Sequence, residues 1–194
     1  MLLRKYRPLP DSKVEYIVIH TSASPQKYTW QWLLHFFLNI LNWSVAGYHV
    51  FIEETGLVKR LVPHGKQSNG VKAFRAKDIF ISNRNAIHIC WEGGIDKNGE
   101  PTDNRTEIQE LELIRVLEWY LWKYPNAKVL GHNQVALKYC PCFNVIEWAR
   151  KIEYTDLHTQ NRRIGIPEER IYKGDNFKVL SYHFGYDSKR KTSA

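Results

Sequence analysis

Two side chains able to bind a metal lie close together in the segment 131–143. His132 and Cys140 are eight positions apart, and Lys138 comes two positions before the cysteine. Neutral imidazole and thiolate are common zinc ligands, at about 2.0–2.1 Å and about 2.3 Å from the ion. The spacing matches neither a CxxC nor an HExxH signature. Taken alone, the pair therefore fits a zinc site and also fits ordinary loop residues.

A catalytic zinc site needs a third protein ligand and one open coordination position. His20 is the best candidate, because it follows the apolar run 16–19 and precedes the polar turn 21–25. A histidine at the end of a buried strand lies at the rim of a sheet and can face a cleft. His132 likewise follows a short apolar run, 127–130, so both imidazoles are expected near the ends of strands.

The elements that must position these residues alternate between strands and helices. Periodicity predicts strands over 14–19, 47–52, 57–62, 86–91 and 128–130, and helices over 30–38, 107–122 and 145–153. Thr29 and Thr106 are the expected helix N-caps. This order predicts an α/β fold, a single domain with a central mixed β-sheet flanked by helices and a C-terminal extension.

Several local expectations follow from the same patterns. Helix 30–38 is expected to be well buried, with His35 as a core histidine, and residues 63–84 are expected to be irregular. Strict alternation along 47–52 would place Tyr48 on one face with Val50 and Ile52, opposite His49 and Phe51.

Length, net charge and cysteine count limit the possible domain organisation and the possible partners. The chain has 194 residues, a net charge of +8 and 3 cysteines, too few for a closed disulfide framework. We expect a lead-in at 1–12, one domain at 13–153, and an extension of unknown role at 154–194, with an ordered piece around 177–184. Positive charge favours an anionic partner, but no nucleic-acid motif is present, so none is expected as a partner.

Membrane insertion and secretion are not expected from the sequence. No apolar run approaches the ~20 residues that a spanning helix needs. The N-terminus lacks the apolar stretch of a signal peptide, so synthesis in the cytoplasm is expected, with later release or export. We expect a monomer.

Four segments, in order, resemble one family. Residues 16–24 (YIVIHTSAS) resemble the "IVIHCSAT" opening of zinc-dependent N-acetylmuramoyl-L-alanine amidases of type 2, which include amidase-type phage lysozymes and peptidoglycan recognition proteins. Residues 46–52 (AGYHVFI) resemble their "IGYHFVI", and residues 85–96 (NAIHICWEGGID) their "NSIGVCLVGGID". Residues 138–143 (KYCPCF) resemble "KACPSFD". The resemblance covers roughly residues 13–152.

Carried over by position, the resemblance implies three Zn²⁺ ligands and two catalytic residues. The ligands are His20, His132 and Cys140, and the catalytic residues are Tyr48 and Lys138. The two catalytic roles, stabilising the oxyanion and handling the water or the leaving amine, are not divided between Tyr48 and Lys138 by sequence.

Other residues near these motifs have roles that the sequence does not decide. Asn69 falls near a position where many members carry histidine, and Cys142 could compete with Cys140 for the metal. Glu92 could support the site as an outer carboxylate, and His88 shares its strand face. A groove formed by 21–28, 64–84 and 131–140 would bind substrate, with Trp43 or Trp91 stacking on sugars.

The implied activity is hydrolysis of the amide between N-acetylmuramic acid and L-alanine of the stem peptide, in peptidoglycan or muropeptides. The expected context is a phage or prophage endolysin. Alternatives are a non-catalytic peptidoglycan-binding module, a regulatory partner, or a cytoplasmic wall-recycling amidase. Binding members typically lack the thiolate ligand, so the presence of Cys140 favours an enzyme.

Overall fold

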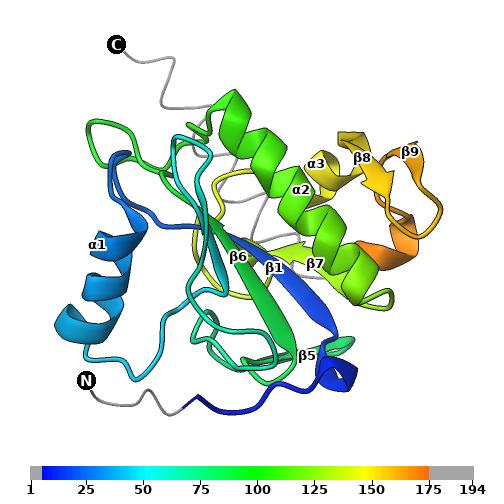
Figure 1. The fold of residues 1–194 in the computed structure, drawn as a ribbon, viewed down its shortest axis with the longest axis horizontal. Helices are drawn as coiled ribbons and strands as arrows, with labels where there is room; N and C mark the ends of the chain where they lie inside the picture. The colour runs from blue at the N-terminus through cyan, green and yellow to red at the C-terminus, as the bar shows by residue number, and fades with distance from the viewer. Residues whose placement is uncertain (1–5, 175–194) are drawn as a thin grey trace.

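A five-stranded mixed sheet forms the centre of the molecule in the computed structural model, which describes residues 6–174 (Figure 1). The strand order is β3-β2-β6-β1-β7, with β3 antiparallel to β2 and the other neighbours parallel. The strands are β1 (Tyr16–Thr21), β2 (Val50–Ile52), β3 (Val58–Arg60), β6 (Ala86–Trp91) and β7 (Lys128–Gly131). The predicted α/β fold with a mixed sheet is confirmed, as are the strand positions to within a few residues.

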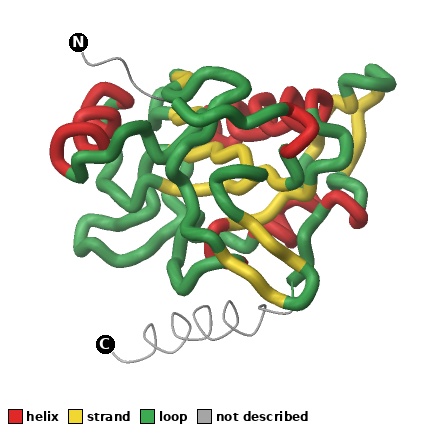
Figure 2. Tube along the Cα trace, turned by 90° about the horizontal axis from the view of Figure 1, so that it is seen from below, coloured by secondary structure: helices red, strands yellow, loops and turns green. Residues whose placement is uncertain are grey.

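Alternating residues of the central strands separate two packed layers. Ile17 and Ile19 of β1, with Ile87 and Ile89 of β6, are buried in the core cluster that also contains residues of α2 (Glu107–Lys123) and α3 (Val145–Lys151). The intervening residues of both strands, including His20, therefore face the opposite side of the sheet. Figures 1 and 2 show α2 apart from α1 (Trp30–His35), which lies at the other end of the molecule.

The sequence determines the start of α2 through a capping box. The Thr106 hydroxyl accepts a hydrogen bond from the backbone N–H of Gln109 at 3.2 Å. The Gln109 side chain accepts one from the Thr106 N–H at 3.0 Å. Two N–H groups at the helix terminus are satisfied in this way, as predicted from Thr106.

Two leucines on α2, one buried and one exposed, allow the packing of the core to be tested. Leu117 is fully buried between α2 and the sheet, whereas Leu111 on the same helix is 57% exposed. We expect Leu117→Ala to lower the free energy of unfolding by about 2–5 kcal/mol, because it removes buried methyl groups and leaves a cavity. Leu111→Ala, the matched control, should change it by less than about 0.5 kcal/mol. Urea denaturation checks this, and equal effects would contradict the burial of Leu117.

The opposite face of the sheet is covered by short elements that the sequence only partly predicted. Residues 63–84 are not wholly irregular, because they include the hairpin of β4 (Phe74–Ala76) and β5 (Ile79–Ile81). Strands of three residues give too little alternation to be recognised among turn signals. Ile79 and Ile81 pack in the cluster that contains Val18 of β1.

Helix α1 is less buried than expected. Thr29 caps it, but only Leu33 of the α-helical turns is buried, and a π-helix at Phe36–Ile40 continues the segment. The expectation of a core histidine at His35 is wrong, because His35 is exposed and bonds to Asn39. The large apolar side chains of this segment do not all face inward, and Trp32 is 39% exposed.

The first part of the predicted extension packs against the domain. A hairpin forms from β8 (Glu153–Asp156) and β9 (Asn161–Ile164), followed by a 3-10 turn at Glu168–Arg170. Ile166 and Ile171 are buried in the same cluster as α2. The boundary at 153/154 stays a prediction, and the expected piece at 177–184 lies outside the described residues. Among residues 6–174, no helix is long and apolar enough to cross a membrane.

Candidate metal centre and active site

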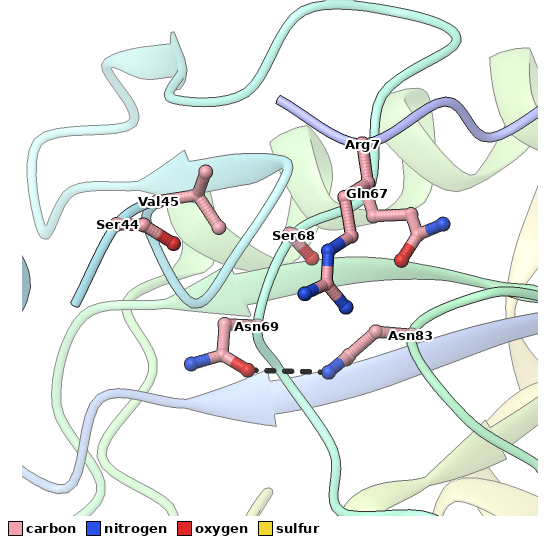
Figure 3. A pocket seen from close by; sticks show the side chains of 7 residues that line it. All are labelled: Arg7, Ser44, Val45, Gln67, Ser68, Asn69 and Asn83. Carbon is pink, nitrogen blue, oxygen red and sulfur yellow. Dashed lines mark hydrogen bonds between the residues drawn. The ribbon is translucent and has the colours of Figure 1, made fainter. Parts of the chain in front are cut away.

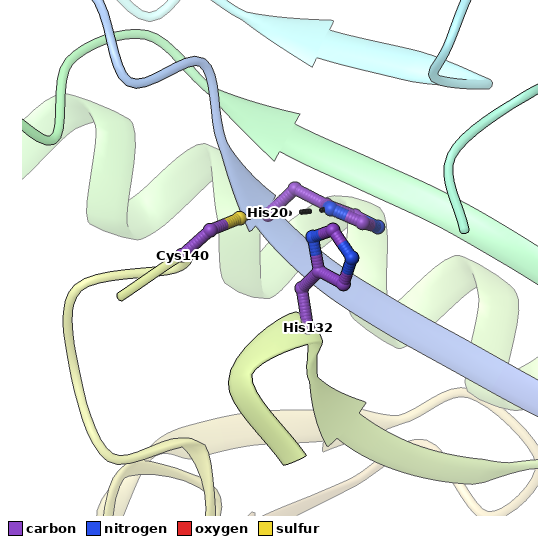
Figure 4. A group of neighbouring side chains, drawn as sticks. All are labelled: His20, His132 and Cys140. Atoms are coloured by element: carbon purple, nitrogen blue, oxygen red, sulfur yellow. Dashed lines mark hydrogen bonds between the residues drawn. The ribbon is translucent and has the colours of Figure 1, made fainter. Parts of the chain in front are cut away.

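Three side chains from distant parts of the chain converge at the carboxyl ends of two parallel strands. His20 is on β1, His132 begins the turn that follows β7, and Cys140 lies on the next loop (Figure 4). Their ligand atoms all lie within 4.8 Å of one another. The Sγ of Cys140 is 3.6 Å from Nδ1 of His20. In a tetrahedral zinc site with ordinary bond lengths, ligand atoms are roughly 3.4–3.8 Å apart.

The surroundings of the sulfur suit a thiolate ligand. The backbone N–H of Thr21 donates a hydrogen bond to Sγ of Cys140 at 3.2 Å. Such a donor stabilises negative charge on sulfur. A donor set of two imidazoles and one thiol is the soft, nitrogen-rich chemistry that zinc prefers. The residues present therefore fit this ion, and the ligand assignment itself stays a prediction.

Burial keeps the two imidazoles neutral. It lowers the pKa of His20 well below its usual value, and the nearby His132 lowers it further. Burial and the charge of Lys138 lower the pKa of His132 to about 4. Burial raises the pKa of the Cys140 thiol to about 12. At neutral pH the imidazole lone pairs are thus ready for a metal, while the thiol must lose its proton on binding.

The two expected catalytic side chains line the same pocket. Tyr48 and Lys138 border a pocket of about 180 Å³ together with His132 and Cys140. The ring of Tyr48 lies 5.0 Å from that of His20. Burial raises the pKa of Tyr48 well above its usual value, and a hydrogen bond to Cys90 adds to this. The phenol of Tyr48 therefore keeps its proton at neutral pH and acts as a donor.

The face assigned to Tyr48 from sequence is wrong. Tyr48 packs against the cluster that contains Phe51 and Cys90, whereas Val50 and Ile52 belong to the α2 side. The reason is that Tyr48 precedes β2, which begins at Val50, so strict alternation does not extend to it. The error does not remove Tyr48 from the pocket.

A wider groove adjoins the group formed by His20, His132 and Cys140, which we call the ligand cluster. A second pocket of about 630 Å³ shares Trp43, Asn69 and Lys138 with the first and runs along residues 69–74. The walls come from the loops predicted to form the groove. Trp43 is placed to contact a ligand, but Trp91 is fully buried, so its expected role in sugar stacking is wrong.

Two polar residues near the motifs have structural contacts. The carboxylate of Glu92 accepts hydrogen bonds from the backbone N–H groups of Tyr28 at 2.5 Å and Glu54 at 2.7 Å. It holds two loops and has no hydrogen bond to the three ligands. The thiol of Cys142 donates to the carbonyl of Gly94 at 3.2 Å, and Cys142 is not part of the ligand cluster.

A small polar pocket lies beside the groove. It has a volume of about 210 Å³ and is lined by Arg7, Gln67 and Asn69, among others (Figure 3). The amide of Asn83 donates to the side-chain oxygen of Asn69 at 3.2 Å. Asn69 also borders the pocket that contains Tyr48 and Lys138, so this hydrogen bond fixes a residue shared by the two pockets.

The sequence left His88 without a role, and the structure places it next to the predicted ligand His20. Nδ1 of His88 lies 2.9 Å from Nε2 of His20, and both residues are fully buried. The two are on neighbouring parallel strands, where Val18 pairs with His88 and His20 pairs with Cys90. Only this register brings the rings together, and sequence spacing gives no signal for it.

Comparison with known proteins places these residues in a family. The model of the family described as N-acetylmuramoyl-L-alanine amidase matches residues 10–143. The endolysin of Escherichia phage T7 is 35% identical over 111 residues, which are 57% of this chain and 68% of that protein. The endolysin of Enterobacteria phage T3 is 31% identical over 145 residues, which are 74% of this chain and 91% of that protein.

The fold agrees with these relatives. The Ph2119 endolysin from a Thermus scotoductus MAT2119 bacteriophage superposes with a TM-score of 0.58 at 22% identity, covering 74% of this chain and 84% of that one. At this identity the likeness shows the fold alone. The family match is independent of it and runs from before His20 to beyond Cys140. The predicted resemblance is confirmed, and the chain belongs to the N-acetylmuramoyl-L-alanine amidase family.

Proposed function

We propose that the chain is a zinc-dependent peptidoglycan amidase that hydrolyses the amide between the lactyl group of N-acetylmuramic acid and L-alanine of the stem peptide. The observation that carries this proposal is the convergence of His20, His132 and Cys140, of which His132 and Cys140 line the pocket. When bound, zinc supplies a Lewis acid for the scissile carbonyl and lowers the pKa of a water. His20 and His132 would bind it through neutral imidazole and Cys140 through thiolate.

Lys138 is the residue we assign to the developing oxyanion. Attack of water on the lactyl carbonyl carbon places negative charge on the carbonyl oxygen, and a cation placed beside that oxygen stabilises it. Lys138 borders both the ligand pocket and the groove. Lys138 also lies near His132, whose pKa its charge lowers.

Tyr48 is the residue we assign to the proton side of the reaction. When the C–N bond breaks, the L-alanine nitrogen must gain a proton to leave as an amine, and the water must lose one. The raised pKa of Tyr48 keeps its hydroxyl protonated. It is therefore suited to donate a hydrogen bond to the water or to the leaving nitrogen, and not to act as the general base.

We assign this activity to a phage or prophage endolysin. Support comes from the similarity of this chain to the endolysins of phages T7 and T3, at 35% and 31% identity. Both are proteins of phages that infect enteric bacteria, so the peptidoglycan of that group is the substrate to test first. A monomeric state and the absence of a nucleic-acid partner remain predictions.

Mass spectrometry of digested, purified peptidoglycan tests the proposed activity. The expected products are free stem peptides beginning with L-alanine and glycan strands that have lost them. Removing metal with a chelator should stop the release of peptide, and added Zn²⁺ should restore it. Release of disaccharides, or cleavage inside the peptide with the lactyl amide intact, would contradict the assignment.

Zinc affinity should rise with pH. The pKa of the Cys140 thiol is raised to about 12, so the metal-free protein carries this proton through the neutral range, while His132 with a pKa of about 4 is already neutral. Each bound ion must then displace the thiol proton, and the apparent Kd should fall about tenfold per pH unit between pH 6 and 8. Competition with a chromophoric chelator measures it, and a Kd independent of pH would exclude the thiol as a ligand.

A further inference from the structure

One buried imidazole stands directly behind a predicted metal ligand. Nδ1 of His88 is 2.9 Å from Nε2 of His20, on the side of the His20 ring away from Cys140. We propose that His88 is a positioning residue that accepts a hydrogen bond from Nε2–H of His20 and so keeps the Nδ1 lone pair of His20 directed at the metal. This inference rests on the proposed zinc site.

The direction of the hydrogen bond follows from what the metal requires. A neutral imidazole carries one proton, and the nitrogen that binds a metal must be the one without it. Nδ1 of His20 is the nitrogen 3.6 Å from Sγ of Cys140, so Nε2 must hold the proton when a metal is bound. The only position for that proton is towards Nδ1 of His88. An acceptor at this point favours the tautomer that binds metal and fixes the plane of the ring.

The backbone of His88 is itself held in place. Its N–H donates to Nδ1 of His49 at 3.0 Å, and the rings of His49 and His88 stack with centroids 5.7 Å apart. Nε2 of His49 in turn donates to the carbonyl of Lys66 at 3.0 Å. His49 and His88 therefore form a stacked pair of imidazoles next to His20. The hydrogen bond to Lys66 connects this pair to the loop that borders the groove.

The groove loop leaves room for the His88 ring. A Cβ atom added to Gly70 would lie 2.5 Å from Cγ and Nδ1 of His88, closer than side-chain atoms can approach. Gly70 also lines the catalytic pocket. The glycine thus allows the loop to close over His88 and leaves its Nδ1 facing His20.

The other nitrogen of His88 argues against a packing role. Nε2 is buried and has no hydrogen-bond partner within residues 6–174. A buried polar group without a hydrogen-bond partner destabilises the folded state. A leucine would fill a similar volume without that cost. That cost is offset if the ring is needed because its Nδ1 accepts the hydrogen bond from Nε2–H of His20.

Two substitutions separate the acceptor from the bulk of the ring. His88→Leu keeps volume and removes the acceptor, whereas His88→Asn can place its side-chain oxygen where Nδ1 lies. We expect the zinc Kd of His88→Leu to rise about 10–100-fold, the usual effect of losing an outer hydrogen-bond partner. His88→Asn should stay close to wild type, and so should the control His35→Leu at an exposed histidine on α1. Chelator competition with Zn²⁺ measures all four proteins.

A spectroscopic readout makes the test independent of activity and of the folding of any variant. In zinc-loaded wild type with ¹⁵N-labelled histidine, the His20 ring should be protonated at Nε2 and metal-bound at Nδ1. Metal bound at Nε2 of His20 would overturn the proposal, as would equal zinc affinity for wild type and folded His88→Leu, or an Asn variant as weak as Leu. Failure of wild type to bind zinc would instead overturn the proposed function.

Discussion

Cys140→Ser is expected to lose zinc and to abolish amide hydrolysis. The serine hydroxyl is far less acidic than a thiol and is a weaker, shorter-reaching ligand, so it cannot replace a sulfur about 2.3 Å from the ion. The loss of a direct ligand should exceed the 10–100-fold effect of losing an outer partner, so we expect the zinc Kd to rise by more than about 100-fold. Peptide release from purified peptidoglycan should fall to background.

The neighbouring thiol supplies the matched control for this prediction. Cys142 is two positions away, but its Sγ donates to the carbonyl of Gly94 and lies outside the ligand cluster. Cys142→Ser should therefore bind one zinc ion with near wild-type affinity and keep most of its activity. Full activity in metal-stripped Cys140→Ser, or a larger loss in Cys142→Ser than in Cys140→Ser, would contradict the choice of ligand.

Lys138→Ala is expected to keep zinc and lose most of its turnover. Lys138 is exposed along the groove, and its side chain makes no hydrogen bond or ion pair with residues 6–174, so its removal should leave the ligand cluster intact. Removing one group that stabilises an oxyanion typically lowers kcat about 10²–10³-fold. Steady-state hydrolysis of a soluble muropeptide measures kcat, and inductively coupled plasma mass spectrometry measures bound zinc.

Two further variants make the Lys138 result specific. Lys138→Arg keeps a cation at this position and should recover part of the lost turnover, because the oxyanion needs charge at that place. Lys128→Ala, at an exposed lysine that begins β7, should change neither zinc content nor kcat. Unchanged kcat in Lys138→Ala would remove Lys138 from the reaction, and loss of zinc in that variant would make its role one of supporting the metal site.

The residues of the cluster were predictable because their signals are local, although their role as ligands stays a prediction. His20 ends an apolar run, and the pair His132 and Cys140 lies on one short loop. The family resemblance joined these signals, which no spacing rule could do across more than 100 positions. The structure brings the three side chains together at the carboxyl ends of parallel strands, the usual position of ligand sites in such sheets.

The features that sequence missed depend on tertiary contacts. The contact of His88 with His20 depends on the register of β1 with β6. Trp91 and Trp43 are the same residue type, but one points into the α2 core and the other borders the groove. The exposure of His35 reflects which side of α1 has no neighbour, a property that helix periodicity does not contain for a segment rich in large apolar residues.

X-ray absorption at the zinc edge of the loaded wild-type protein tests the proposed ligand set. We expect one equivalent of zinc with a single sulfur at about 2.3 Å and two imidazole nitrogens at about 2.0–2.1 Å, completed by one light atom from solvent. The zinc–sulfur signal should remain in Cys142→Ser, whereas Cys140→Ser should retain too little zinc to give one. A zinc environment without sulfur in the wild-type protein, or with two sulfurs, would contradict the assigned centre.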